Sequence, residues 1–130
     1  MLKCETILGA LLLFNTSNVI AEAWHCRNSD VEISCHKAKC EVSDSFTPLD
    51  VYFDRQGNMS VGMYSGVWEG QGKMTNMPGY LLVMGKDLVF SASPDSKENF
   101  LVVLDVRDNV AVFKGADYAM PMVCEHHNLE

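Results

Sequence analysis

The chain has 130 residues, of which 48% are hydrophobic and 21% are charged, and its formal net charge is −7. The length predicts a single domain, and the composition excludes a disordered chain. The negative charge argues against nucleic acid as a partner, because phosphate groups would be repelled, and it favours a basic protein instead.

The N-terminus has the pattern of a signal peptide. Lys3 precedes an apolar run at residues 7–14, which suits the hydrophobic region of a leader and is too short to cross a bilayer. Small residues offer two cleavage sites, after Ala21 and after Ala23, and we expect the second to be used. A short buried N-terminal helix is the alternative interpretation.

Removal of residues 1–23 leaves one mature domain, residues 24–128. Leu129 and Glu130 follow it and are a candidate cloning remnant. No stretch of this domain approaches the ~18 apolar residues of a transmembrane helix. The sequence therefore predicts a periplasmic or secreted protein with no membrane span in its mature form.

The cysteine count supports export. Cys4 lies in the leader, and an even number of cysteines in the remaining small domain predicts a disulfide framework. These cysteines allow several pairings, and their spacing favours Cys35 with Cys40 across a hairpin tip and Cys26 with Cys124 between the first and last strands. A zinc site is the alternative, but its candidate ligands lack the paired C-x-x-C spacing: His25, Cys26, Cys35, His36 and Cys40.

Apolar and polar residues alternate along most of the mature domain, and helical periodicity is nearly absent. The predicted strands are 31–35, 49–53, 59–63, 67–73, 80–84, 88–92, 100–106, 110–113 and 119–124. Turns are predicted at 54–58, 77–79, 85–87 and 107–109, with a polar loop at 93–98. About eight to ten short strands at this spacing predict an all-β domain, either a small antiparallel β-barrel or a β-sandwich.

Signatures of catalysis are absent from the sequence. It has no G-x-S-x-G elbow, no H-E-x-x-H motif, no P-loop and no dinucleotide fingerprint. The histidines lie near the chain ends or at the predicted hairpin tip, and nothing pairs them with a nucleophile: His25, His36, His126 and His127. The sequence therefore predicts a protein that is not an enzyme and needs no cofactor.

Methionine is over-represented, with eight residues in the chain. Thioether sulfur is a soft ligand that selects Cu(I) or Ag(I). Two closely spaced pairs are the candidate metal ligands: Met74, Met77, Met120 and Met122. The other interpretation treats these four as a flexible apolar surface and assigns three further methionines to the core: Met59, Met63 and Met84.

The most distinctive local feature is an aromatic and glycine-rich stretch at residues 64–72. Alternation places Trp68 on the inward side and Glu69 on the wet side of its strand, so that Trp68 either lines a pocket or packs in the core. If Trp68 is sealed in the core, Tyr64 and Glu69 remain as the exposed contacts. These three residues are the predicted site for a ligand or a partner.

The order Trp24-His25-Cys26 near the start of the domain and Cys124 near its end resembles the bacterial inhibitors of c-type lysozyme. Those proteins are small exported β-barrels with a cysteine near each end of the domain. The resemblance covers the architecture and these two cysteines. No segment matches the inhibitory loop of that family, so no functional residue is transferred.

These observations predict an exported, non-enzymatic binding module for a protein or a small ligand, one version being an inhibitor of a basic enzyme. A soft-metal protein that uses methionines is the second hypothesis, and a secreted enzyme is the third.

Overall fold

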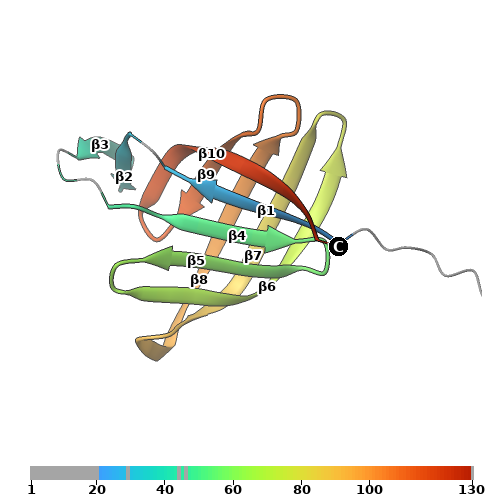
Figure 1. Cartoon of the computed structure of the whole chain (residues 1–130). Helices are drawn as coiled ribbons and strands as arrows, with labels where there is room; N and C mark the ends of the chain where they lie inside the picture. The colour runs from blue at the N-terminus through green and yellow to red at the C-terminus, as the bar shows by residue number, and fades with distance from the viewer. Residues whose placement is uncertain (1–20, 29, 44, 46, 130) are drawn as a thin grey trace, which may run out of the picture.

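The computed structural model in Figure 1 describes residues 21–129 except 29, 44 and 46. The domain is all-β, as the alternation predicts, and neighbouring strands are antiparallel. The strands of these residues are β1 (Ala21–Arg27), β2 (Glu32–His36), β3 (Lys39–Ser43), β4 (Asp50–Asp54), β5 (Asn58–Met63), β6 (Gly66–Met77), β7 (Tyr80–Phe90), β8 (Ser93–Asp105), β9 (Val110–Gly115) and β10 (Tyr118–Leu129). Most of the predicted leader and Glu130 lie outside the described residues.

Eight of the strands form a closed barrel. β4 to β10 pair in sequence order, and β1 pairs with β4 on one side and with β10 on the other, which closes the sheet. The β2–β3 hairpin joins β10 beside the barrel, where Tyr118 lies opposite Ser34, and it projects to one side in Figure 1. Of the two predicted architectures, the barrel is therefore correct.

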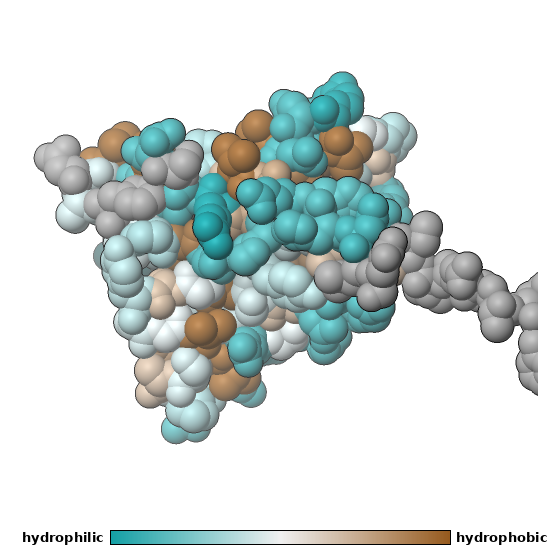
Figure 2. Space-filling view, in the orientation of Figure 1, coloured by the Kyte–Doolittle hydropathy of each residue, from teal (hydrophilic) through white to brown (hydrophobic). Residues whose placement is uncertain are grey.

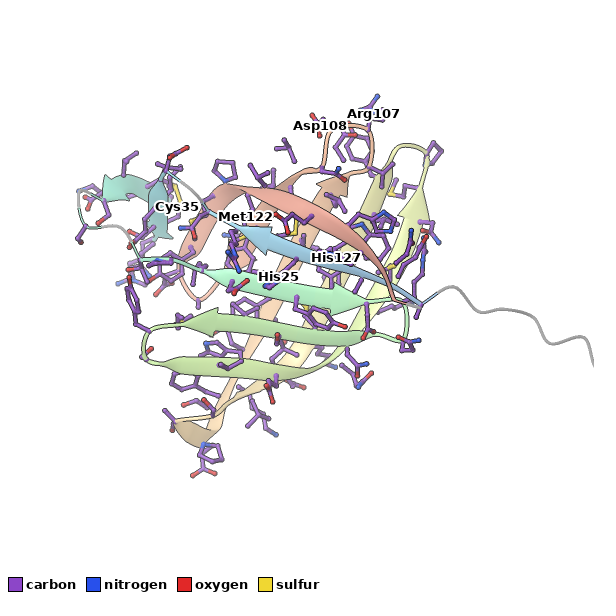
Figure 3. The ribbon with its side chains drawn as sticks, viewed as in Figure 1. His25, Cys35, Arg107, Asp108, Met122 and His127 are labelled. Atoms are coloured by element: carbon purple, nitrogen blue, oxygen red, sulfur yellow. A yellow bond between two sulfur atoms is a disulfide. The ribbon has the colours of Figure 1, made fainter. Side chains whose placement is uncertain are left out.

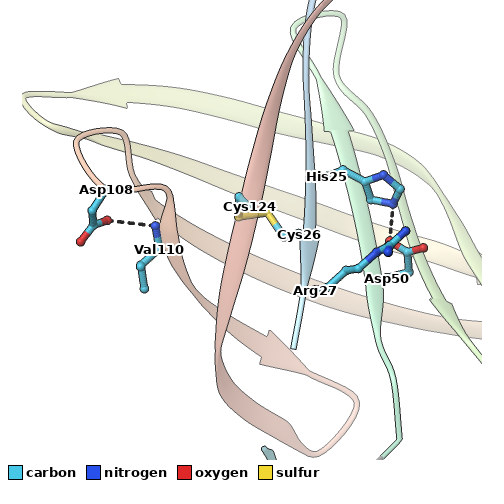
Figure 4. The surroundings of a disulfide bond; sticks show 7 residues. All are labelled: His25, Cys26, Arg27, Asp50, Asp108, Val110 and Cys124. Carbon is cyan, nitrogen blue, oxygen red and sulfur yellow. Dashed lines mark hydrogen bonds and ion pairs between the residues drawn. A yellow bond between two sulfur atoms is a disulfide. The ribbon is translucent and has the colours of Figure 1, made fainter. Parts of the chain in front are cut away.

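Both predicted disulfides are present. Cys26 faces Cys124 in the β1–β10 ladder, so this bond crosslinks the two strands that close the barrel (Figure 4). Cys35 faces Cys40 across the β2–β3 hairpin. Two disulfides are compatible with an oxidising extracellular or periplasmic compartment.

Side chains fill the barrel interior, as is usual for a barrel of this strand number. Alternate residues point inward from every barrel strand and form one core cluster. The largest fully buried side chains are Phe53, Phe100, Phe113, Leu49, Leu88, Leu104, Met120, Met122, Val51, Val61 and Val102. The described residues include no helix with the length and hydropathy needed to cross a membrane.

The predicted turn at 85–87 is wrong. β7 continues through these residues, with a shift in register between Gly85 and Leu88. Gly85 fits this bulge because a Cβ atom there would lie 2.6 Å from the sulfur of Met59. Glycine and charged residues therefore mark an irregularity inside one strand and not a break between two strands.

The predicted polar loop at 93–98 is also wrong, because β8 begins at Ser93. Lys97 pairs with Val89, and Glu98 pairs with Leu88, so the β7–β8 hairpin continues through this segment. Lys97 is exposed and Glu98 is half-buried. Such a hairpin has the polar composition of a loop, although its backbone pairs as a strand.

Candidate functional site

Tyr64 lies with Ser65 in the turn between β5 and β6 and has the largest exposed fraction, 83%, among the exposed large hydrophobic side chains of the described residues. The backbone beside it is anchored, because the Ser91 amide donates to the Val67 carbonyl over 2.8 Å. The Val67 amide in turn donates to the Ser91 hydroxyl over 2.9 Å. The turn therefore presents an aromatic side chain on backbone that is held in place.

Gly66 makes this anchored turn possible. Its φ is +156°, and a Cβ atom there would lie 2.7 Å from the ring of Phe90 and 2.9 Å from the hydroxyl of Ser91. Both contacts are closer than a side chain permits. Glycine is therefore required where the turn packs against β7.

Trp68 points inward, as predicted, and packs partly buried against the core. Its ring stacks on Phe90 with 4.7 Å between centroids and meets the edge of Phe100 at 5.7 Å. The buried indole Nε1 has no hydrogen-bond partner among the described residues. Trp68 therefore supports the β5–β6 hairpin from inside, while Tyr64 and Glu69 remain exposed.

Glu69 lies on the outer side of the barrel, in a row that crosses three strands. Tyr52 on β4 pairs with Ser60 on β5, which pairs with Glu69 on β6. An open hollow of about 450 Å³ lies over this row, here called the β4–β6 hollow, and its lining residues are Tyr52, Asn58, Met59, Ser60, Glu69, Gly70 and Gln71. Alternation along β4 and β5 also predicts outward positions for Tyr52 and Ser60, although the sequence analysis did not select them.

Next to this hollow, Tyr52 and Asn58 donate hydrogen bonds to the Asp54 carboxylate. Burial acts to raise the pKa of the Asp54 carboxyl, but hydrogen bonds from Asn58, from Tyr52 and from the backbone outweigh it and hold that pKa below its ordinary value. Burial is also the main cause that raises the pKa of Tyr52, assisted by its hydrogen bond to Asp54. At neutral pH the Asp54 carboxylate and the Tyr52 hydroxyl group are therefore the stable forms, and the surface is acidic.

The end of the barrel opposite Tyr64, where the β4–β5 turn lies, is closed over Trp24. His126 stacks on the indole at 4.9 Å between centroids, and the guanidinium carbon of Arg55 lies 5.3 Å from the indole centroid. Arg55 is held by Glu22, with 2.6 Å between Nε and Oε2, and by the side-chain oxygen of Asn76 over 3.2 Å. This end therefore carries a cation–π contact inside an ion-paired network.

A hollow of about 380 Å³ lies next to this network, here called the Trp24 hollow. Its residues come from β1, β6, β7 and β10 and from the β4–β5 and β8–β9 turns, and they are Glu22, Trp24, Arg55, Asn76, Met77, Tyr80, Leu81, Val106, Asn109 and His126. Glu22, Asn76 and the Trp24 ring already contact the guanidinium of Arg55, so this side chain helps to close this end of the barrel. This cluster cannot be predicted from the sequence, because its residues are far apart along the chain and none forms a local motif.

The structure does not place the four candidate methionine ligands on one surface. Met120 and Met122 are 2% and 1% exposed in the core, Met74 is partly buried, and Met77 is 51% exposed at the end of β6. The expectation that these four form a flexible apolar surface is therefore wrong for Met120 and Met122. The assignment of Met84 to the core is also wrong, because this side chain is 52% exposed. Soft-metal binding by the four methionines stays a prediction that Ag(I) titration tests.

The histidines each lie beside a carboxylate of the same chain. His25 contacts Asp50, His36 lies 3.5 Å from Asp117, His126 lies 3.8 Å from Glu22, and His127 lies 3.6 Å from Glu125. Figure 3 shows His25 on β1 and His127 on β10. Within the described residues, no group of three or more His, Cys, Asp or Glu side chains is arranged to hold a metal ion.

No protein-family model, curated protein or solved structure matches the chain.

Proposed function

We propose that the chain is an exported, non-enzymatic binding module whose ligand is a protein, contacted through Tyr64 and the acidic outer surface around Glu69. The observation that carries this proposal is the exposure of Tyr64, 83%, on an anchored hairpin turn. Tyrosine supplies a large contact area at a small entropic cost, and aromatic side chains dominate the binding energy of many interfaces.

A protein ligand is favoured over a small one by the state of the barrel interior. Core side chains occupy it, and Trp68 packs on Phe90 and Phe100. The β4–β6 hollow and the Trp24 hollow, at about 450 Å³ and 380 Å³, both lie open at the surface. A protein partner binds to the outer surface of the barrel, whereas a small ligand would need space in an interior that core side chains fill.

The net charge of −7 favours a basic partner. One version of the proposal is an inhibitor of a basic enzyme, and a c-type lysozyme is the probe that tests it. Its cell-wall lysis and its binding are measured with wild type, with Tyr64→Ala and with Glu69→Gln. Gln56→Ala is the matched control, because Gln56 is exposed in the β4–β5 turn at the other end of the barrel.

We expect Tyr64→Ala to weaken binding by about 30-fold or more, the effect of losing an aromatic hot spot. Glu69→Gln should lower mainly the association rate and its salt dependence. Gln56→Ala should leave both unchanged. Full lysozyme activity with no complex at micromolar concentrations would overturn the inhibitor version.

The broader proposal is tested without choosing a partner. A photo-crosslinking amino acid replaces Tyr64 in one variant and Gln56 in another, and both are expressed in the exporting host. Position 64 should form a discrete adduct with another protein, and position 56 should not. Equal labelling at both positions, or labelling at neither, would overturn the assignment of this surface.

A further inference from the structure

The outer side of the barrel has an apolar half. Where β7 to β10 lie side by side over residues 82–84, 101–103, 110–112 and 121–123, the outward residues are all hydrophobic, although one outer side of an antiparallel sheet in water is normally polar. Further along β7 and β8 the outward residues are polar, as at Lys86, Lys97 and Asn99. The residues of this outer apolar face are Leu82, Met84, Leu101, Val103, Val110, Val112, Pro121 and Val123. Figure 2 shows separate hydrophobic patches on the upper side of the molecule, with hydrophilic surface between them.

Strand register makes this face continuous. Leu82 pairs with Val103, Val103 pairs with Val112, and Val112 pairs with Pro121, so one apolar row crosses all four strands. Val112 at its centre is 58% exposed, and Val123 and Met84 on either side are 56% and 52% exposed. Strands about 4.8 Å apart and a repeat of about 6.8 Å along each strand give three outward rows on these four strands roughly 400 Å², of which the apolar residues fill about two thirds.

The other half of the outer surface differs. Outward positions on β1, β4, β5 and β6 carry mainly polar and charged side chains: His25, Arg27, Asp50, Tyr52, Ser60, Glu69, Gln71 and Lys73. The barrel is therefore amphipathic on its outside. A contiguous apolar patch of a few hundred Å² is near the largest that a monomer in water normally exposes, and such patches are often functional.

Two opposite charges lie at the two ends of this face. Lys114 ends the outward series of β9, and it has no ion-pair partner within the described part of the chain. Asp108 lies in the β8–β9 turn, where one carboxylate oxygen accepts from the Val110 amide over 2.9 Å (Figures 3 and 4). The strand from Val110 to Lys114 alone spans about 14 Å, so the two residues cannot meet within one molecule.

We propose that a second copy of this chain covers the outer apolar face, with a two-fold axis that lies between the two copies, above β9 at the level of Ala111. Ala111 is midway between Asp108 and Lys114 in the sequence. This axis places Val112 of one copy over Val110 of the other, and Lys114 of one over Asp108 of the other. Each contact then occurs twice, as a self-complementary interface requires.

The charges around the face favour a second copy over a membrane. Its border carries carboxylates at Asp105, Asp117 and Glu125 and cations at Arg107 and Lys114, so it presents no excess of basic side chains that would attract anionic lipid headgroups. A purely basic partner would leave Lys114 without a counterion, whereas an identical copy supplies both signs. Roughly 400 Å² per copy is about half of a standard interface, so we expect a dimer that forms between roughly 10 μM and 1 mM.

Sedimentation velocity of the exported protein across this concentration range tests the proposal. Val112→Asp, at the centre of the face, should weaken dimerisation at least 10-fold. Gln56→Asp adds the same charge in the β4–β5 turn and should leave dimerisation unchanged. Circular dichroism and thermal unfolding of every variant establish that the fold is retained.

Charge exchange tests the position of the two-fold axis. Lys114→Glu and Asp108→Lys should each weaken self-association about 10-fold, because each places like charges together. An equimolar mixture should recover the affinity of wild type, since the heterodimer restores both pairs with their signs reversed. General apolar association would show no such recovery.

A protein that stays monomeric at 1 mM would overturn the proposal. So would a dimer that is unaffected by Val112→Asp, or a mixture of charge variants that shows no recovery. Binding of the monomer to vesicles of zwitterionic or anionic lipid, lost in Val112→Asp, would assign the face to a membrane instead.

Discussion

The disulfide between Cys26 and Cys124 should contribute far more to stability than the disulfide between Cys35 and Cys40. The first joins residues separated by 98 positions and the second joins residues separated by 5. In the chain-entropy model these loops correspond to about 4.7 and about 2 kcal/mol of unfolding free energy at 25 °C. Loss of the first bond also leaves space in the core, because Cys26 and Cys124 are 0% and 4% exposed.

The comparison uses two double variants, Cys26→Ala with Cys124→Ala and Cys35→Ala with Cys40→Ala. Urea unfolding followed by tryptophan fluorescence gives the free energy of each, and we expect a difference of at least about 2.5 kcal/mol between them. If a variant is already unfolded in buffer, its loss of unfolding free energy is at least the whole stability of wild type. The two double variants can then still be ranked. Equal losses, or a larger loss for the hairpin pair, would refute the reasoning.

Three further predictions concern single positions. Because hydrogen bonds hold the pKa of Asp54 below its ordinary value of 3.8, the stability it contributes is present above that pH and is lost as pH falls through the lower folded pKa. Asp54→Asn should therefore be less stable than wild type at pH 7, with a smaller difference near pH 3 in urea unfolding. Gly66→Ala should cost roughly 1–3 kcal/mol in urea unfolding, because its Cβ would collide with Phe90. Gly62→Ala, whose Cβ would meet nothing closer than 3.6 Å, is the matched control and should cost less. Intact mass of the exported protein should correspond to a chain that begins at Trp24, because Ala21 and Ala23 place small residues at the preferred cleavage site, and a mass that begins at Glu22 would contradict this.

Alternation could predict which side chains fill the barrel, but it could not predict which strands pair. Each inward position follows from a period of two along its own strand, as at Met59 and Val61, which are 2% and 0% exposed. Closure depends on contacts between the two ends of the chain, and Cys26 and Cys124 were the one sequence signal for it. Disulfide spacing therefore carried topological information that hydropathy lacks.

Some errors came from signals that the sequence did contain. Met120, Met122 and Cys124 share one period-two register, so a buried cysteine at 124 already indicates two buried methionines. The wrong loop at 93–98 had no such signal, because hairpin residues that face water have the composition of a loop. Polar residues report exposure, and exposure alone does not distinguish a strand from a turn.

The candidate site was only partly predictable for a similar reason. Tyr64, Trp68 and Glu69 are neighbours in sequence, and alternation alone predicted the inward direction of Trp68. Arg55 packs over Trp24 because the β4–β5 turn folds back onto β1. Such a contact needs the tertiary fold before it can be recognised.

The two proposed surfaces lie on different strands, and this makes them separable. Tyr64 and Glu69 belong to the β5–β6 hairpin, whereas Val112 is at the centre of the face formed by β7 to β10. Binding at one surface should therefore leave the other free, and a dimer should hold two partner molecules. We expect Val112→Asp to abolish the dimer without changing partner affinity, and Tyr64→Ala to weaken the partner without changing dimerisation. Sedimentation and binding measured on the same two variants decide this, since an effect of either variant on both measurements would show that the surfaces overlap or are coupled.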